Sequence, residues 1–253
     1  MEIKMMRIDD NWDKKTGIVP LLDDCIQEMT TSSISILGGE KLIIEPDDHY
    51  HVFVLISGSI SFETDGKSFD FNSRATFVPA PDSSIQIKAK TNAGLLYIRV
   101  LKHDEDPQLL SEYGTVFPYV MPYESSKQYW DVHKTQKTIP RIMLEQRTIP
   151  RMCMGSCESL GYDEIIAHAH PMLDQYFYSF PENHTTVSID DEKIDFKGNM
   201  IMYIPLGSNH GSTVDLGNHL HYVWIDFFND EAGMKRLDTM HKDTGKTRKI
   251  TDL

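Results

Sequence analysis

Short runs of β-branched and aromatic residues recur along this chain at regular intervals, separated by glycine, aspartate, asparagine and proline. Runs of this length, bounded by turn residues, are typical of single strands. Thr64-Asp65-Gly66-Lys67 is a hairpin signal, because Asp-Gly tolerates the positive φ values of a tight turn. The pattern predicts an all-β fold, either a sandwich or a barrel. In the first half, the expected strands cover residues 33–37, 41–45, 52–56, 59–64, 84–89 and 94–100.

The strand pattern stops near residue 103 and restarts near residue 138. The intervening segment is polar and rich in proline and serine, with one or two helical turns expected at 108–113. After residue 230 the chain is charged, which predicts a short helix at 231–240 and a frayed end. We therefore expect two barrels, at 1–105 and 138–230, joined by a partly helical linker at 106–137 and followed by a tail at 231–253. In the second half, the expected strands cover 138–143, 148–152, 164–168, 175–180, 185–189, 200–204 and 219–228.

Composition excludes several classes of partner. The formal net charge of −13 repels phosphate backbones, so a nucleic-acid partner is not expected. Neither a membrane-spanning apolar run nor a signal peptide is present in the sequence, so we expect a cytoplasmic protein without a membrane partner. The three cysteines do not form a Cys-x-x-Cys pair, and we expect them to be reduced.

Three histidines in the second half have the spacing of a metal site. His168 and His170 are two residues apart, so on a strand both side chains point to the same face. Gln175 follows five residues later, and His210 follows a Pro-x-Gly turn. Imidazole suits Zn, Fe, Ni, Cu and Mn, so these residues predict a site for one transition metal.

These residues resemble the paired motifs of the cupin superfamily, which are small β-barrels. His168, His170 and Gln175 match the ligands of the first motif, with Gln in place of the usual Glu, and His210 matches the ligand of the second. The likeness covers about residues 140–228. It implies two cupin barrels of the double-stranded β-helix (jelly-roll) type, with one divalent transition metal per chain (Mn, Fe, Ni or Zn).

The first half resembles the same architecture without its ligands. If Gly58 closes the first motif, His51 falls on the carboxylate position, and the paired-histidine positions fall on Ile44 and Pro46. Ser84 then stands at the histidine position of the second motif. The pair His49 and His51 is therefore not expected to bind metal, and the metal site of the first barrel is expected to be degenerate.

Among two-barrel cupins, the second half is most similar to 5-keto-4-deoxyuronate isomerase and 5-deoxyglucuronate isomerase. Their His-x-His-x4-Glu strand runs on into aromatic residues and a proline, as residues 168–181 do here, with Gln175 at the carboxylate position. The resemblance implies a metal-dependent isomerase or lyase that acts on a small sugar acid or keto-sugar. It also implies a homodimer, because two-barrel cupins commonly pair through strand edges. Gln175 departs from these enzymes, which carry a glutamate at this position.

The chemistry of the predicted site leaves alternatives open. Neutral ligands leave the metal charge uncompensated, so an anionic substrate is expected, and Mn, Fe or Ni suits an open four-ligand site better than tetrahedral Zn. His221 and Tyr203 are the preferred catalytic residues, with His219 and Asp226 as further candidates for a base or a substrate contact. A non-haem metal dioxygenase, a hydrolase and a non-catalytic binding or sensing protein remain alternatives, because one fold hosts many functions.

Overall fold

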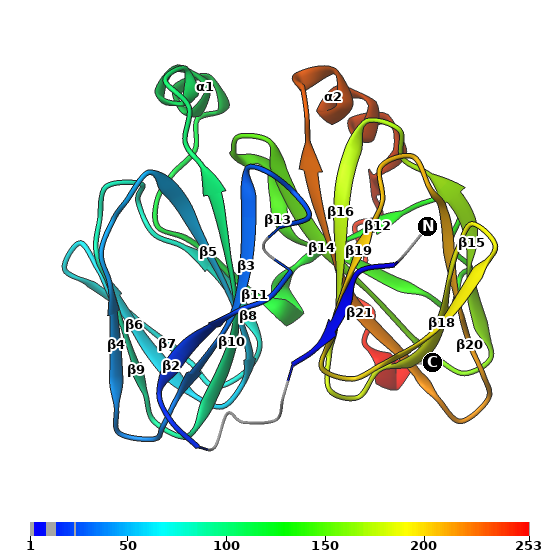
Figure 1. Ribbon diagram of the computed structural model, residues 1–253, viewed down its shortest axis with the longest axis horizontal. Coiled ribbons are helices and arrows are strands. Elements are labelled where there is room, and N and C mark those ends of the chain that lie inside the picture. The colour runs from blue at the N-terminus through cyan, green and yellow to red at the C-terminus, as the bar shows by residue number, and fades with distance from the viewer. Residues whose placement is uncertain (1–2, 9–13, 23, 253) are drawn as a thin grey trace. The chain divides into compact units, whose positions relative to one another are not determined.

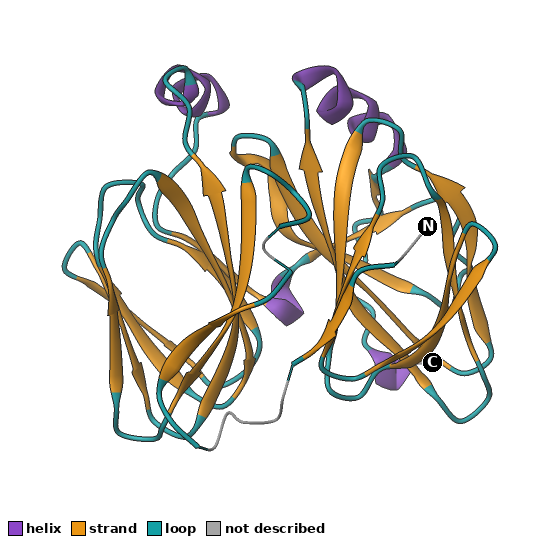
Figure 2. Ribbon diagram, viewed as in Figure 1, coloured by secondary structure: helices purple, strands orange, loops and turns teal. Residues whose placement is uncertain are grey.

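The computed structural model describes residues 3–8, 14–22 and 24–252, and most of them lie in strands (Figure 2). The expected all-β class is confirmed. The chain divides into two compact units. The N-terminal unit contains residues 8–124 and 147–150, and the C-terminal unit contains residues 1–7, 125–146 and 151–253.

The N-terminal unit contains two antiparallel sheets that face each other (Figure 1). Their inward side chains form one apolar core, in which the Phe53 and Phe77 rings stack 5.1 Å apart. The predicted hairpin is confirmed, since Asp65 and Gly66 have φ values of 51° and 70° and Thr64 pairs with Lys67. The six-stranded sheet has the order β11 (Tyr119–Pro122), β8 (Ala75–Val78), β5 (His49–Ser57), β10 (Ala93–Leu101), β3 (Met29–Ile36) and β2 (Gly17–Pro20), and the four-stranded sheet has the order β4 (Lys41–Ile44), β9 (Ile85–Ala89), β6 (Ile60–Thr64) and β7 (Lys67–Phe71).

The C-terminal unit repeats this two-sheet plan around a second apolar core. Its larger sheet takes strands from three separate parts of the chain, including the N-terminal strand β1. The larger sheet has the order β1 (Met5–Arg7), β19 (Met200–Ile204), β16 (Leu173–Ser179), β21 (His219–Phe228), β14 (Met152–Leu160), β13 (Ile139–Ile149), β12 (Lys127–Trp130) and β22 (Lys242–Asp243). The smaller sheet has the order β15 (Asp163–Ala169), β20 (Asn209–Val214), β17 (His184–Ile189) and β18 (Glu192–Lys197).

The segment 106–137, which the sequence predicts to be a linker, is ordered along its length. It contains helix α1 (Asp106–Tyr113), strand β11, the 3-10 turn η2 (Tyr123–Ser125) and strand β12. The expected helical turns are therefore present. Because β11 joins a sheet of the N-terminal unit and β12 joins a sheet of the C-terminal unit, the division between the units falls inside this segment.

The end of the chain belongs to the C-terminal unit. Helix α2 spans Glu231–Met240, as predicted, and the Asp230 carboxylate caps it by accepting a hydrogen bond from the Gly233 amide at 2.8 Å. The expectation of a frayed end is wrong, because β22 pairs with β12 and the Arg248 carbonyl accepts a hydrogen bond from Gln128 at 2.6 Å. The last turn, η3, covers Ile250–Asp252.

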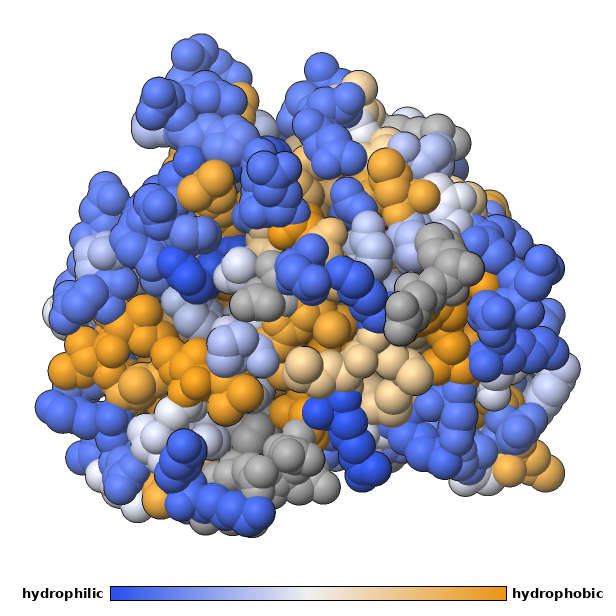
Figure 3. Space-filling model, in the orientation of Figure 1, coloured by the Kyte–Doolittle hydropathy of each residue, from blue (hydrophilic) through white to orange (hydrophobic). Residues whose placement is uncertain are grey.

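Hydrophilic residues cover α1 and α2 on the face shown in Figure 3, in line with the low mean hydropathy of the chain. Among the described helices, none has the length and apolar character needed to cross a membrane.

Candidate metal centre and cavity

Strands β15 and β20 bring the three predicted histidines together. His168 lies directly opposite His210 in this ladder, and His170 follows just beyond the end of β15. The register shifts between Ile165 and His168, which is a β-bulge that re-aims the strand, so that both side chains face the cavity. One nitrogen from each histidine lies within 4.8 Å of the others. The imidazoles can therefore approach a single ion.

Backbone carbonyls orient two of these rings. Nδ1 of His168 is 2.7 Å from the Ile166 carbonyl, and Nδ1 of His210 is 3.0 Å from the Ser208 carbonyl. A carbonyl only accepts, so Nδ1 carries the proton in both rings and Nε2 keeps its lone pair. Hydrogen bonds of this kind fix the tautomer of metal-binding histidines in many proteins.

Burial keeps the cluster neutral. Burial is the main reason that the pKa of His168 is lowered to about 4 and that of His170 to about 2, and the charge of Lys134 acts in the same direction. Burial also lowers the pKa of His210. At neutral pH the rings are thus unprotonated, which is the form that coordinates a metal.

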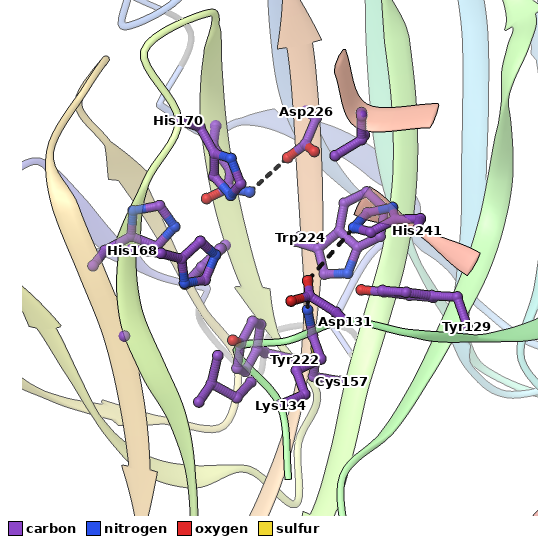
Figure 4. Close-up of a pocket in the computed structure, with 16 residues that line it drawn as sticks. Tyr129, Asp131, Lys134, Cys157, His168, His170, Tyr222, Trp224, Asp226 and His241 are labelled. Atoms are coloured by element: carbon purple, nitrogen blue, oxygen red, sulfur yellow. Dashed lines mark hydrogen bonds and ion pairs between the residues drawn. The ribbon is translucent and has the colours of Figure 1, made fainter. Parts of the chain in front are cut away.

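Gln175 lines the cavity beside the histidines, and Asp226 holds it from behind. The two residues are opposite each other in the β16–β21 ladder, and Nε2 of Gln175 donates to Oδ1 of Asp226 at 2.6 Å. Figure 4 marks this bond by the dashed line that ends at the labelled Asp226. Oε1 of Gln175 is buried and has no hydrogen-bond partner among the described residues. A buried acceptor of this kind fits a metal ligand. The neighbouring Asp174 instead accepts a hydrogen bond from Tyr203, at 2.7 Å, and does not line the cavity.

The Asp226 carboxyl is fully enclosed by the protein. Burial raises its pKa to about 7, although the Gln175 hydrogen bond and the Lys134 charge act in the opposite direction. The carboxyl is therefore protonated far more readily near neutral pH than an exposed aspartate, which suits a residue that both accepts and releases a proton.

Residues outside the predicted barrel complete the cavity, which encloses about 420 Å³ including its opening. Asp131 Oδ2 pairs with Lys134 Nζ at 2.7 Å, and its Oδ1 lies 3.0 Å from His133 Nδ1. The His133 ring stacks on His168 with the centroids 4.1 Å apart. His241, which follows α2, packs against Tyr129 at 4.1 Å. These residues were not predicted from the sequence, because they lie in the segments expected to be a linker and a tail.

Comparison with known proteins shows the fold. No protein-family model matches the sequence, and no curated protein matches it either. Among solved structures, a cupin 2 conserved barrel domain protein from Leptotrichia buccalis is 12% identical, with a TM-score of 0.59, over 90% of this chain and 98% of its own. The chain has the cupin fold.

Two further cupin-like structures are similar at the same low level. Bacillus subtilis oxalate decarboxylase, studied for its Mn(II) centres, is 12% identical, with a TM-score of 0.66, over 90% of this chain and 77% of its own. An IolB-like protein from Salmonella typhimurium LT2 is 11% identical, with a TM-score of 0.70, over 91% and 94%. At these identities the likeness concerns the fold alone.

The cupin cavity does not contain the two residues that sequence analysis preferred as catalytic. Nδ1 of His221 lies 2.6 Å from Oε1 of Glu182, and Tyr203 bonds to Asp174; none of these four residues lines the cavity. The catalytic roles of His221 and Tyr203 stay predictions, whereas Asp226, a further candidate, does line the cavity.

In the N-terminal unit, the histidines of β5 make local contacts. Nδ1 of His51 lies 2.6 Å from the Tyr97 hydroxyl, and its Nε2 lies 3.2 Å from Asp47. His49 is within ion-pair distance of Asp47 and Asp48. Nδ1 of His51 is therefore hydrogen-bonded within the unit, whereas its Nε2 is at ion-pair distance from Asp47 without a hydrogen bond to any described residue.

Proposed function

We propose that this chain is a metal-dependent enzyme that isomerises a small anionic sugar acid or keto-sugar in the cavity of the C-terminal unit. The observation that carries the proposal is the buried Asp226 carboxyl, which lines the same cavity as three histidines able to hold a metal. Isomerisation moves a proton between adjacent carbons, so it needs a proton carrier beside the group that binds the substrate oxygens.

His168, His170 and His210 would hold the metal, with Oε1 of Gln175 as a fourth ligand. The bound metal supplies Lewis-acid stabilisation of negative charge on substrate oxygens. We favour Mn, Fe or Ni, because four protein ligands would close a tetrahedral Zn site. The Mn(II) centres of the similar oxalate decarboxylase support this choice.

Asp226 has the geometry of the proton carrier. Its Oδ1 accepts the hydrogen bond from Gln175, which orients the carboxylate. We assign the proton transfer to Oδ2, which takes a proton from one substrate carbon and returns it to the next. Lys134 Nζ, which is held by Asp131 in the cavity wall, is the cation available to an anionic group of the substrate.

A metal dioxygenase or hydrolase is the second candidate, because three histidines and one neutral ligand also suit iron with bound oxygen. Removing O2 distinguishes these functions: the isomerase keeps its activity without O2, whereas the dioxygenase loses it. A binding or sensing protein would bind the same compounds without converting them.

Metal analysis tests whether His168, His170 and His210, which we call the histidine cage, hold the metal. We expect the histidines to account for one metal per chain, which His168→Ala and His210→Ala should each remove, whereas the control His51→Ala should not. Elemental analysis of purified protein that carries no histidine tag is the measurement. The decisive quantity is the loss of metal in each variant relative to wild type, because metal bound at any other site stays the same. If both variants retain the wild-type amount of metal, the proposed metal site is refuted.

Proton transfer tests Asp226. Asp226→Asn keeps the size of the side chain but removes the base, so we expect unchanged metal content and activity lowered about 10²- to 10⁴-fold. The assay follows conversion of uronates and keto-sugars in D2O and deuterium incorporation at the exchanging carbon. The matched control is Asp174→Asn, at the residue before Gln175 on β16, which does not line the cavity and should stay active. Equal activity of wild type and Asp226→Asn would refute the assigned role.

A further inference from the structure

Strand β21 presents a second group of metal-ligand side chains on the face opposite the cavity. Tyr222, Trp224 and Asp226 line the cavity, and His219 and His221 alternate with them and point the other way. Glu158 on β14 lies directly opposite His221 in the ladder. One ligand atom each of Glu158, His219 and His221 lies within 4.8 Å of the others.

We propose that Glu158, His219 and His221, together with Glu182, form a second binding site for a divalent cation, with Zn²⁺ as the best-fitting ion. Two imidazoles and two carboxylates are a ligand set that Zn²⁺ accepts in tetrahedral geometry. The two carboxylates supply negative ligands for a divalent ion, one of them already paired with Arg141, whereas the proposed ligands in the cavity are all neutral.

Two distances within the proposed ligand set fit coordination better than hydrogen bonding. Oε1 of Glu158 lies 3.5 Å from Nε2 of His219 and 3.5 Å from Nδ1 of His221. Tetrahedral ligands with bonds of about 2.0–2.1 Å are separated by roughly 3.3–3.4 Å, whereas N–H···O bonds are about 2.7–3.2 Å long. Nδ1 of His221 and Oε1 of Glu182, at 2.6 Å, would move apart to admit the ion.

An unsatisfied atom also points to a missing partner. Nε2 of His219 is buried and, in the described part of the chain, makes no hydrogen bond of good geometry, although Oε1 of Glu158 lies 3.5 Å away. Burying such a nitrogen without a partner costs free energy, and a bound cation would use its lone pair.

The surroundings hold the proposed ligands in place. Nη1 of Arg141 donates to Oε2 of Glu158 at 2.8 Å, which leaves Oε1 on the side of the histidines. The backbone amide of His221 donates to Oδ1 of Asn183 at 2.7 Å, and the Phe180 ring packs 4.4 Å from the His221 ring. A buried and oriented ligand set of this kind needs little rearrangement on binding. In this arrangement His221 binds a metal instead of acting in catalysis.

Zn²⁺ titration of the untagged full chain tests the second site. We expect two Zn²⁺ per chain for wild type by calorimetry and elemental analysis, and one for the double variant H168A/H210A. Adding His219→Ala to that double variant should remove the remaining ion, whereas adding the control His184→Ala, a half-exposed histidine on β17, should not. Because the double variant lacks the cavity cage, the result does not depend on the proposed enzyme function.

Co²⁺ gives a readout of coordination that is independent of activity. Co²⁺ added to the double variant should produce the visible absorption of a tetrahedral site. Adding Glu182→Gln, which changes the more exposed ligand, should weaken this absorption, and this variant replaces His219→Ala where the latter does not fold. A double variant that binds neither Zn²⁺ nor Co²⁺ would overturn the proposal and leave the cluster as an ion-pair network around Arg141. Binding that persists unchanged in both ligand variants would overturn it as well.

Discussion

His241 offers a quantitative test of how the cavity is built. Its ring packs between Tyr129 and Trp224, with centroids 4.1 and 5.5 Å away, and its Nε2 is 3.8 Å from Asp131. Burial is the main reason that the pKa of His241 is lowered to about 3, and the charge of Lys134 lowers it further, while Asp131 opposes the shift. The folded protein therefore keeps this ring neutral.

The sign of the pH effect follows from proton binding. The unfolded chain protonates His241 near pH 6.5, whereas the folded chain does so only near pH 3, so between these values the unfolded state binds more protons. Stability that is fully present above pH 6.5 is thus lost progressively as the pH falls toward 3. Linkage gives a loss of about 2 kcal/mol between pH 7 and pH 5 for this single group.

His241→Phe keeps an aromatic ring of similar size and removes the titrating group. We expect the free energy of unfolding of chelator-treated protein to fall by about 2 kcal/mol less for this variant than for wild type between pH 7 and pH 5. Urea unfolding at several pH values measures the difference. The control His184→Phe replaces a half-exposed histidine and should follow the wild-type curve. If the His241→Phe and wild-type curves are parallel, the neutral burial of His241 is refuted.

Two further substitutions test packing and hydrogen bonding in the C-terminal unit. Gly155→Ala should cost about 3 kcal/mol or more by urea unfolding, because its Cβ would lie 2.2 Å from a backbone carbonyl and 2.2 Å from an indole ring, whereas the control Gly17→Ala meets nothing within 4 Å. Gln175→Leu removes the donor to the buried Asp226 and should cost about 1–3 kcal/mol, while Tyr203→Phe, which removes a less buried bond, should cost less. Equal losses within either pair would contradict these assignments.

Local pattern was enough to predict some of the strands that carry the two cores, whereas β8 and β14, which also contribute core residues, were missed. Strands such as β5, β10, β16 and β21 are rich in β-branched and aromatic residues, and their buried side chains mark them in the sequence. The strand β20 was missed because Asn209–Val214 is polar and contains a glycine. It is a strand because β15 and β17 pair with it from both sides, and its partners are distant in sequence. Strand β1 was missed for a similar reason, since among the described strands it pairs with β19, which is distant in sequence.

The cavity shows the same limit at the level of single residues. The spacing of His168 and His170 could be judged from one strand, and the structure places them with His210 and Gln175 in one cavity. The sequence could not decide between Asp226 and His221 as the residue in the cavity. The two lie five apart on one strand, so they face opposite sides of the sheet, but the strand alone does not show which side faces the cavity. The β16–β21 ladder decides between them by placing Asp226 opposite Gln175. A shift of one residue in that register would put the other face of β21 into the cavity and exchange the two candidates.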